Sequence, residues 1–245
     1  MKLKDKVIIV TGGSGLLGRA ILEQIIKEGA LAVNLDINIP ENSPCFSVKA
    51  DITEEKEAKE AIGKVMEKFG RIDGLVNNAY PRTKDWGAFF EDIPFDTWNQ
   101  NVKMQMGTTF FLCQQVAEIM KKQQSGSIVN MSSIYGVVGP DFTIYGSTGM
   151  TVAAAYSAIK GGTVNFTRYL SAYLGPHKIR VNCISPGGIF DNQKEEFVRN
   201  YEAKVPLRRM GLPADIAPGV AFLLSEDSAY ITGHNLIIDG GWTAI

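Results

Sequence analysis

The sequence predicts an α/β protein with a doubly wound, Rossmann-type parallel sheet of about seven strands in three layers, α/β/α. Short runs rich in Val, Ile and Leu recur along the chain, and most are continuously apolar, as strands buried on both faces of a parallel sheet are. The segments between them are long enough for crossover helices. Because no linker or repeat divides the chain, we expect a single domain of this type over residues 1–245, with any active site built into it.

The expected strands follow one another at regular intervals. In chain order they are KVIIVTG at 6–12, ALAVNLD at 30–36, CFSVKAD at 45–51, IDGLVNNA at 72–79, SIVNMSS at 127–133, RVNCISPG at 180–187 and NLIIDGG at 235–241. The helix after the third strand starts near DITEEKE, where Thr53 can cap the first amides. The connections 80–95 and 139–150 are long and follow strands, so we expect both beside the binding crevice.

The composition excludes several classes of partner. The net charge of −1 argues against nucleic-acid binding, and no apolar run reaches the ~20 residues that span a bilayer. The apolar run after the basic start MKLKDK is too short for a signal peptide. Cys45, Cys113 and Cys183 are widely spaced and odd in number, which fits free thiols in a cytoplasmic protein. With two histidines and no Cys-x-x-Cys motif, no metal site is expected.

A glycine-rich turn, TGGSGLLG at 11–18, joins the first strand to the following helix. Glycines in such a turn let the backbone approach a pyrophosphate, and the helix start supplies free amides and a favourable dipole. Tight strand–helix turns also use glycine for structural reasons, so the position directly after the first strand is what favours a dinucleotide site. The candidate cofactor-binding residues here are Gly12, Ser14, Gly15, Leu17 and Gly18.

Asp36 ends the second strand, 24 residues after Gly12. An acid at this place accepts hydrogen bonds from the adenosine ribose and repels a 2′-phosphate, so we expect NAD, with NADP the less favoured cofactor. Ile37 stands where a basic residue would suit the phosphorylated cofactor. The alternative is that Asp36 is a solvated turn residue. Asp51 and Ile52, after the third strand, are candidates to flank the adenine.

Two Tyr-x-x-x-Lys matches occur, Tyr80–Lys84 and Tyr156–Lys160. Pro81 places the first in a loop, whereas the second lies in an expected long helix, where residues i and i+4 share a face. Lowering a tyrosine pKa from about 10 by about 3 units requires roughly 4 kcal/mol. A cation about 4 Å away supplies about that much at an effective dielectric of about 20. We therefore expect Tyr156 to act as a general acid/base.

A hydroxyl donor near the same substrate oxygen would polarise it, and SIVNMSS offers Ser132 and Ser133. Adjacent strand residues face opposite ways, so only one of them can point into the site. The alternative is that both serines simply begin a loop.

Together these motifs resemble the compact, single-domain branch of the short-chain dehydrogenase/reductase family, over nearly the whole chain. The resemblance implies that Ser133 holds the substrate oxygen and that Tyr156 is the acid/base. Lys160 would lower the tyrosine pKa and bind the nicotinamide ribose, and the protein would be a homodimer or homotetramer. The motifs that carry the resemblance are TGGSGLLG, Asp36, Asp51-Ile52-Thr53, Asn77-Asn78-Ala79, Ser133, Tyr156-x-x-x-Lys160, Pro186-Gly187 and ITGHNLIIDGG. The same resemblance adds Asn78, Ala79, Pro186 and Ile189 to the cofactor-binding set.

Four positions depart from the family pattern. The glycine spacing of TGGSGLLG is common in the longer, sugar-nucleotide branch, and Tyr80 replaces the usual glycine after Asn77-Asn78-Ala79. Gln105 falls where the family usually has a catalytic relay asparagine, so it is a fourth catalytic candidate. Asp191 stands where a cofactor-binding threonine is common.

The 139–150 segment, with NNAYPR and PGGIFDNQ, is similar to a subgroup found with bacterial flagellin-modification and nonulosonic-acid sugar pathways. This similarity implies an NAD-dependent oxidoreductase that interconverts an alcohol and a ketone on a polar, sugar-like small molecule. Arg82 and Lys84 could meet a phosphate or carboxylate, or belong to a solvated loop. The alternative functions are a dinucleotide-sensing module without turnover, and a sugar-nucleotide epimerase or dehydratase.

Overall fold

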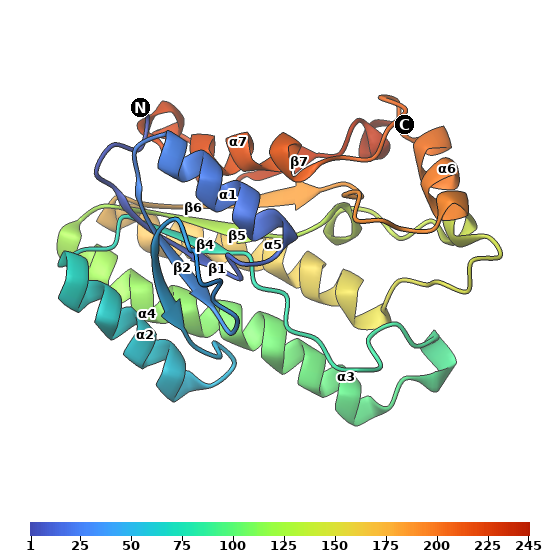
Figure 1. Cartoon of the computed structure of the whole chain (residues 1–245), viewed down its shortest axis with the longest axis horizontal. Coiled ribbons are helices and arrows are strands. Elements are labelled where there is room, and N and C mark those ends of the chain that lie inside the picture. Colours follow the sequence, from blue (N-terminus) through green and yellow to red (C-terminus); the bar gives the residue numbers. More distant parts are fainter.

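The computed structural model describes residues 1–245 and contains one seven-stranded sheet, in which every strand pairs in parallel with its neighbours (Figure 1). Each predicted strand corresponds to one strand of the structure, so the predicted fold class is confirmed. The strands are β1 (Val7–Thr11), β2 (Leu31–Asp36), β3 (Phe46–Lys49), β4 (Gly74–Asn77), β5 (Gly126–Met131), β6 (Ile179–Pro186) and β7 (Asn235–Ile238).

The strand order is β3-β2-β1-β4-β5-β6-β7. Strands β2 and β3 therefore extend the sheet on one side of β1, and β4 to β7 extend it on the other side. Strand β1 pairs with β2 on one side and with β4 on the other. The connections that leave β1 and β4 therefore run to opposite faces of the sheet. In open α/β sheets, the crevice at the carboxyl ends of such a pair is the usual ligand site.

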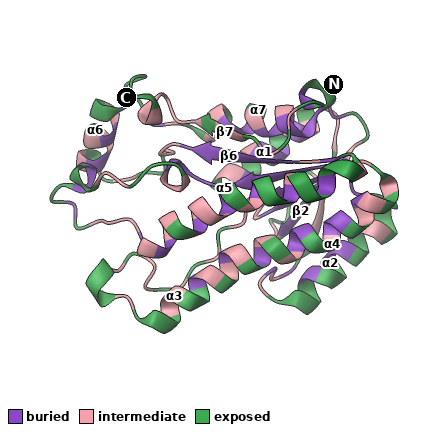
Figure 2. Ribbon diagram, turned by 180° about the vertical axis from the view of Figure 1, so that it is seen from behind, coloured by how far each residue is buried: buried purple, intermediate pink, exposed green.

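Helices cover both faces of the sheet, and their buried sides face it (Figures 1 and 2). Ile8 and Val10 belong to the apolar core under α1 and α7, whereas Val7 and Ile9 belong to the core under α2, α4 and α5. Strand β1 is apolar at successive positions because both of its faces are covered. The helices are α1 (Leu16–Lys27), α2 (Glu55–Phe69), α3 (Phe95–Val102), α4 (Thr108–Gln123), α5 (Ala154–Leu174), α6 (Glu195–Lys204) and α7 (Pro213–Leu224).

The expected cap at Thr53 is wrong. Helix α2 begins at Glu55, with Glu54 as its N-cap and no side-chain capping hydrogen bond. The Thr53 hydroxyl and amide instead donate to Asp51 Oδ1, at 2.7 and 2.9 Å. The Thr53 hydroxyl is therefore engaged in a local turn closed by the Asp51 side chain and does not cap the helix.

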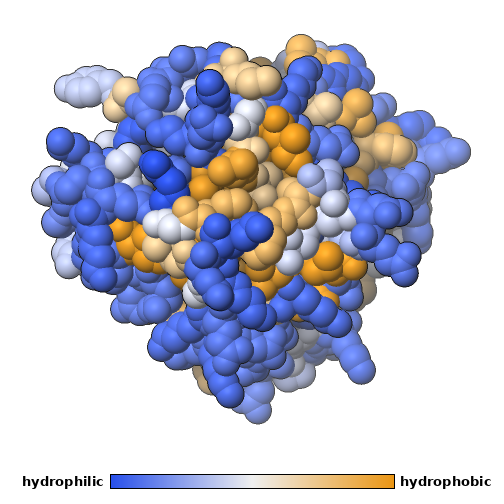
Figure 3. All heavy atoms as spheres, turned by 60° about the vertical axis from the view of Figure 1, so that its left-hand side comes forward, coloured by the Kyte–Doolittle hydropathy of each residue, from blue (hydrophilic) through white to orange (hydrophobic).

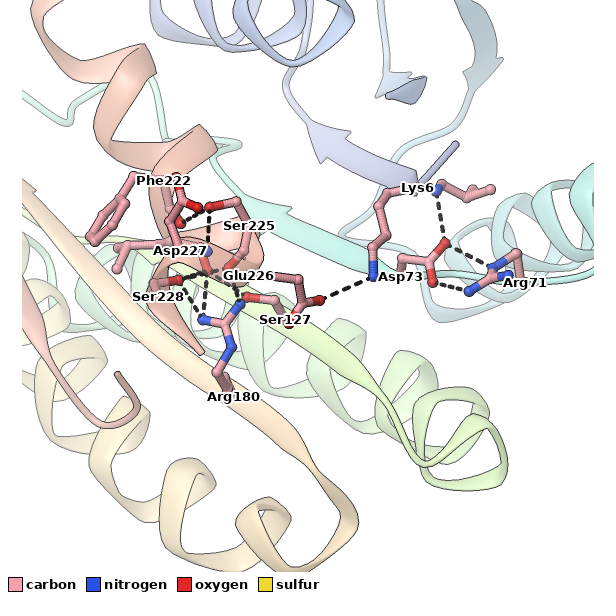
Figure 4. Close-up of polar contacts among 12 residues, drawn as sticks. Lys6, Arg71, Asp73, Ser127, Arg180, Phe222, Ser225, Glu226, Asp227 and Ser228 are labelled. Atoms are coloured by element: carbon pink, nitrogen blue, oxygen red, sulfur yellow. Dashed lines mark hydrogen bonds and ion pairs between the residues drawn. The ribbon is translucent and has the colours of Figure 1, made fainter. Parts of the chain in front are cut away.

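Polar contacts tie the elements together at the amino ends of the strands (Figure 4). The Arg180 guanidinium on β6 donates to the carbonyl oxygens of Leu223 and Ser225, at 2.7 and 3.0 Å. The buried carboxylate of Asp73, before β4, accepts from the Val7 amide at 2.9 Å and from the Arg71 guanidinium. The network therefore joins β1, β4, β6 and the end of α7, on the rim opposite the ligand crevice.

The 139–150 connection packs against α6. Its Ile144 and Tyr145 form a small apolar cluster with Phe197 and Tyr201 of α6. Polar contacts reinforce this packing: Lys204 Nζ pairs with the Asp141 carboxylate, Asn200 Nδ2 donates to Ile144 O at 3.2 Å, and the Ser147 amide donates to Glu196 at 3.0 Å. Residues far apart in the sequence thus form one structural unit beside the crevice.

Apolar side chains are not spread evenly over the surface. Figure 3 shows a largely hydrophilic face on which apolar side chains gather near the centre. Separately, aromatic side chains are exposed on α4 and α5: Phe110, Tyr169 and Tyr173 each expose half or more of their surface. None of the helices combines the length and the apolar character needed to cross a bilayer.

Candidate active site

A cleft of about 1320 Å³ opens at the carboxyl ends of the strands. Most of the cofactor-binding and catalytic candidates line it: Gly12, Ser14, Gly15, Leu17, Asp36, Asp51, Ile52, Asn78, Ala79, Ser133, Tyr156, Lys160, Pro186 and Ile189. Asp191 lines it too. Gly18 and Gln105 are the two candidates that do not.

The turn from β1 into α1 is shaped for a close backbone approach. Gly12 has φ +64°, and a Cβ there would lie 2.8 Å from Ala79 Cα. A Cβ on Gly18 would lie 2.1 Å from the Gly12 carbonyl oxygen, so Gly18 is needed for packing inside the turn rather than for lining the cleft. No side chain caps the first turn of α1. The amides at its start are therefore available to a phosphate.

Asn78 locks the turn to the end of β4. Its side-chain amide donates to the carbonyl oxygens of Thr11 and Gly12, at 3.0 and 3.1 Å. The backbone amides of Asn78 and Ala79 both donate to Thr11 Oγ1 at 3.1 Å. The crevice between β1 and β4 is thereby held at a fixed width.

The Asp36 carboxylate is held at the cleft edge by two backbone amides. Oδ2 accepts from the Ser14 amide at 3.0 Å, and Oδ1 accepts from the Asn38 amide at 2.9 Å. Each carboxylate oxygen can accept a further hydrogen bond, so the pair suits two neighbouring hydroxyl groups. With the open amides of α1, these residues fit the adenosine and pyrophosphate parts of a dinucleotide.

The two serines that follow β5 have separate partners. Ser132 Oγ donates to the Lys160 carbonyl oxygen at 2.8 Å, which ties β5 to α5. Ser133 caps the short turn after β5, where its Oγ accepts from the Tyr135 amide at 3.2 Å. Ser133 also interacts with the Tyr156 hydroxyl, and this contact acts to lower the pKa of that phenol. Ser133 is therefore the serine that the fold brings to Tyr156.

Tyr156 and Lys160 meet, but not through the phenol oxygen. Lys160 Nζ lies 5.5 Å from the centre of the Tyr156 ring and donates to the Met131 carbonyl oxygen at 2.8 Å. Burial raises the pKa of Tyr156, and burial lowers the pKa of Lys160 to about 8. The direction for Tyr156 is opposite to the sequence-based expectation, because desolvation outweighs the other effects when the ammonium lies over the ring rather than beside the hydroxyl.

Gln105 lies away from this group. It belongs to the π-helical segment Lys103–Gly107 between α3 and α4, and both polar atoms of its buried side chain lack a hydrogen-bond partner. The side chain lines a separate cavity of about 10 Å³ with Asn77 and Thr108. The structure therefore does not place the Gln105 amide with Ser133, Tyr156 and Lys160.

Several aromatic residues pack around Tyr156 that the sequence did not predict as site residues. The rings of Tyr80, Trp86 and Tyr135 lie edge-on to the Tyr156 ring, with centroid distances of 5.7, 6.1 and 6.4 Å. Tyr80 and Trp86 belong to the long 80–95 connection, whose length was one signal, and Tyr80 also stands out because it replaces the family's usual glycine. Nothing in the sequence except nearness to Ser133 marks Tyr135.

The chain matches the profile of a family described as enoyl-(acyl carrier protein) reductase over residues 17–243. It is 34% identical to the post-translational flagellin modification protein A of Campylobacter coli, over 98% of this chain and 99% of that protein. It is also 32% identical to a 7alpha-hydroxysteroid dehydrogenase of Bacteroides fragilis, over 99% of this chain and 96% of that protein.

Among solved structures, a short chain dehydrogenase from Leptospira borgpetersenii with bound NAD+ superposes with a TM-score of 0.91. The two sequences are 39% identical, and the match covers 99% of this chain and 94% of the other. The structural match therefore extends over nearly the whole chain.

Proposed function

The chain belongs to the short-chain dehydrogenase/reductase family of oxidoreductases, and on that basis we propose that it interconverts an alcohol and a ketone on a polar, sugar-like substrate with NAD. One observation carries the proposal: Ser133, Tyr156 and Lys160 line the same cleft as the glycine turn and Asp36. A proton-transfer group and a dinucleotide-binding turn in one cavity are what a hydride-transfer enzyme needs.

Different residues of the chain would bind different parts of the cofactor. The amides at the start of α1 would bind the pyrophosphate, and Asp36 the adenosine ribose. Asn78, Ala79, Pro186 and Ile189 would border the nicotinamide end, and the bound nicotinamide supplies the hydride acceptor or donor. Asp36, and the absence of a basic residue at Ile37, support NAD over NADP. The bound NAD+ of the Leptospira relative supports a nicotinamide dinucleotide as the cofactor.

The proton chemistry is assigned to the phenol. Tyr156 would give its proton to a substrate carbonyl oxygen, or take one from a hydroxyl, while the Ser133 hydroxyl donates a hydrogen bond to the same oxygen. Because burial raises the pKa of Tyr156, the resting phenol keeps its proton, as carbonyl reduction requires. Oxidation would require the Lys160 ammonium to approach the hydroxyl and lower that pKa.

The substrate class rests on the 139–150 connection beside the cleft and on the similarity to a flagellin modification protein. For assembly, we propose a homodimer or homotetramer, because the exposed rings of Tyr169 and Tyr173 stack 6.1 Å apart on α5 and offer an apolar contact surface. The three free cysteines suit a reducing cytoplasm.

The test is turnover with NADH, followed by absorbance, over a panel of sugars, sugar acids and sugar phosphates. Tyr156→Phe should lower kcat about 10²- to 10⁴-fold, while NADH binding, measured by fluorescence, stays within about twofold. Tyr169→Phe on the same helix is the matched control and should keep full turnover. A Tyr156→Phe protein with normal turnover would contradict the mechanism.

The panel also separates the alternative functions. A dinucleotide sensor would bind NADH and turn over no compound. An epimerase or dehydratase would change the sugar without net NADH consumption, because it regenerates its cofactor within each cycle.

A further inference from the structure

We propose that Tyr80, Arg82 and Trp86 form a substrate-recognition subsite that binds an anionic group, a carboxylate or a phosphate, carried by the substrate. The inference rests on the proposed oxidoreductase function and adds the substrate's chemical class.

The first support is position. The 80–95 connection leaves the end of β4, and its residues Tyr80 and Arg82 line the cleft. The connection is anchored to α3: the Thr83 amide donates to Asn101 Oδ1 at 3.1 Å, and Asn101 Nδ2 donates to Thr83 Oγ1 at 2.8 Å. Arg82 is thus attached to backbone that is fixed next to the catalytic group.

The second support is the set of cations in the cleft, which are Arg19, Arg82 and Lys160. Arg19 Nε donates to Ser14 O at 2.7 Å, and Lys160 donates to Met131 O at 2.8 Å. Arg82 forms no ion pair with any acidic side chain of the chain. Its charge therefore remains available to a ligand.

The guanidinium is also presented in a suitable way. Its central carbon lies 5.3 Å from the centre of the Tyr80 ring, so the group is supported by an aromatic ring. A guanidinium in this position can use its N–H fork for a carboxylate or phosphate, which it binds with two parallel hydrogen bonds. The Tyr80 ring in turn lies 5.7 Å from the Tyr156 ring. The anion would accordingly sit one ring away from the reacting centre.

The third support is the aromatic wall. Trp86 lies edge-on to Tyr80 at 5.6 Å and to Tyr156 at 6.1 Å. Tyr80 and Tyr156 line the cleft, and Trp86 packs against both of them from behind. Aromatic faces suit the C–H face of a sugar ring, while Arg82 supplies a cation that no acidic side chain neutralises and that no backbone carbonyl occupies. The arrangement selects a hydroxylated compound with an anionic end over a neutral one.

The test measures binding of three matched probes to the NADH complex by the change in NADH fluorescence: glucose, glucuronate and glucose 6-phosphate. We expect at least one anionic probe to bind tenfold or more tightly than glucose, and its identity distinguishes carboxylate from phosphate recognition. Arg82→Gln should lower the affinity for that probe to the affinity for glucose. Arg82→Lys should give an intermediate affinity, because lysine cannot form the two parallel hydrogen bonds. Lys84→Gln is the control, since Lys84 is an exposed cation of the same connection that does not line the cleft.

The inference is overturned if the wild-type protein binds neither anionic probe more tightly than it binds glucose. It is also overturned if the protein binds none of the three probes. It is equally overturned if the preference survives in Arg82→Gln. NADH affinity should be the same in all variants, which shows that the fold and the cofactor site are intact. Because the readout is binding, its failure is separate from a failure of the turnover test on Tyr156.

Discussion

The Lys160 ammonium nitrogen lies 5.5 Å from the centre of the Tyr156 ring, and its hydrogen bond goes to the Met131 carbonyl oxygen. In this arrangement burial favours the neutral form of both groups, since it raises the pKa of Tyr156 and lowers that of Lys160 to about 8. The pair therefore affects both the chemistry of the cleft and the stability of the fold.

Lys160→Met should change how stability depends on pH. The unfolded lysine titrates near 10.4, above its folded pKa of about 8, so between these values the unfolded chain binds more protons and stability rises with pH. The rise amounts to at most about 3 kcal/mol, and it is smaller because Lys160 keeps some solvent contact. Urea unfolding from pH 7 to 10.5 should show the wild-type free energy increasing relative to the variant. Parallel curves would contradict the assignment.

Asp36→Asn should change the choice of cofactor. The amide keeps the shape of the side chain and one acceptor oxygen but removes the charge that repels a 2′-phosphate. We expect the ratio of NADPH to NADH affinity, measured by fluorescence titration, to rise about tenfold or more. Asp5→Asn, an exposed position before β1, should leave the ratio unchanged. An unchanged ratio in Asp36→Asn would show that the carboxylate does not face the ribose.

Asp73→Ala should destabilise the fold without altering the cleft. It leaves the buried Val7 amide and the Arg71 guanidinium without their acceptor, which costs about 1 to 3 kcal/mol. Glu226→Ala removes an exposed partner of Lys6 and should cost less than about 1 kcal/mol. Urea unfolding measures both variants, and the folded Asp73→Ala protein should bind NADH normally. Equal losses in the two variants would contradict this ranking.

Lys204→Met should loosen the 139–150 connection. Its partner Asp141 has a pKa lowered to about 2, first of all by the hydrogen bond from Lys204. Because a surface pair contributes up to about 1 kcal/mol, amide hydrogen exchange in residues 142–145 should quicken by up to about fivefold. Arg199→Met breaks a pair with Glu195 that lies within α6, so it is the matched control. Equal exchange in both variants would show that the pair does not hold the connection.

Most of the fold could be predicted because continuous apolar runs are hard to place anywhere except in a buried parallel sheet. The glycine turn was equally predictable, since Gly12 and Gly18 lie where an added Cβ would clash with neighbouring atoms. The helix start within DITEEKE was predicted, but the cap at Thr53 was not right, because the nearby Asp51 side chain accepts the hydrogen bond of that hydroxyl.

Side-chain directions could not be predicted. Sequence spacing placed Lys160 on the same face as Tyr156, but it could not show that the ammonium would bond to Met131 O. Likewise, Gln105 lies in a π-helical segment and its side chain lines a separate cavity, and residue spacing gives no sign of either. The ring contacts of Tyr135 depend on tertiary packing alone.

The polar network of Arg180 and Asp73 and the ligand-facing loops occupy opposite rims of the sheet and share no residue (Figures 1 and 4). Resistance to heat and choice of substrate can therefore be engineered as independent traits. A directed-evolution library confined to residues 80–95 and 139–150 would change substrate specificity while the rest of the fold stays the same. Stabilising substitutions at the opposite rim would let the fold tolerate loop substitutions that lower its stability.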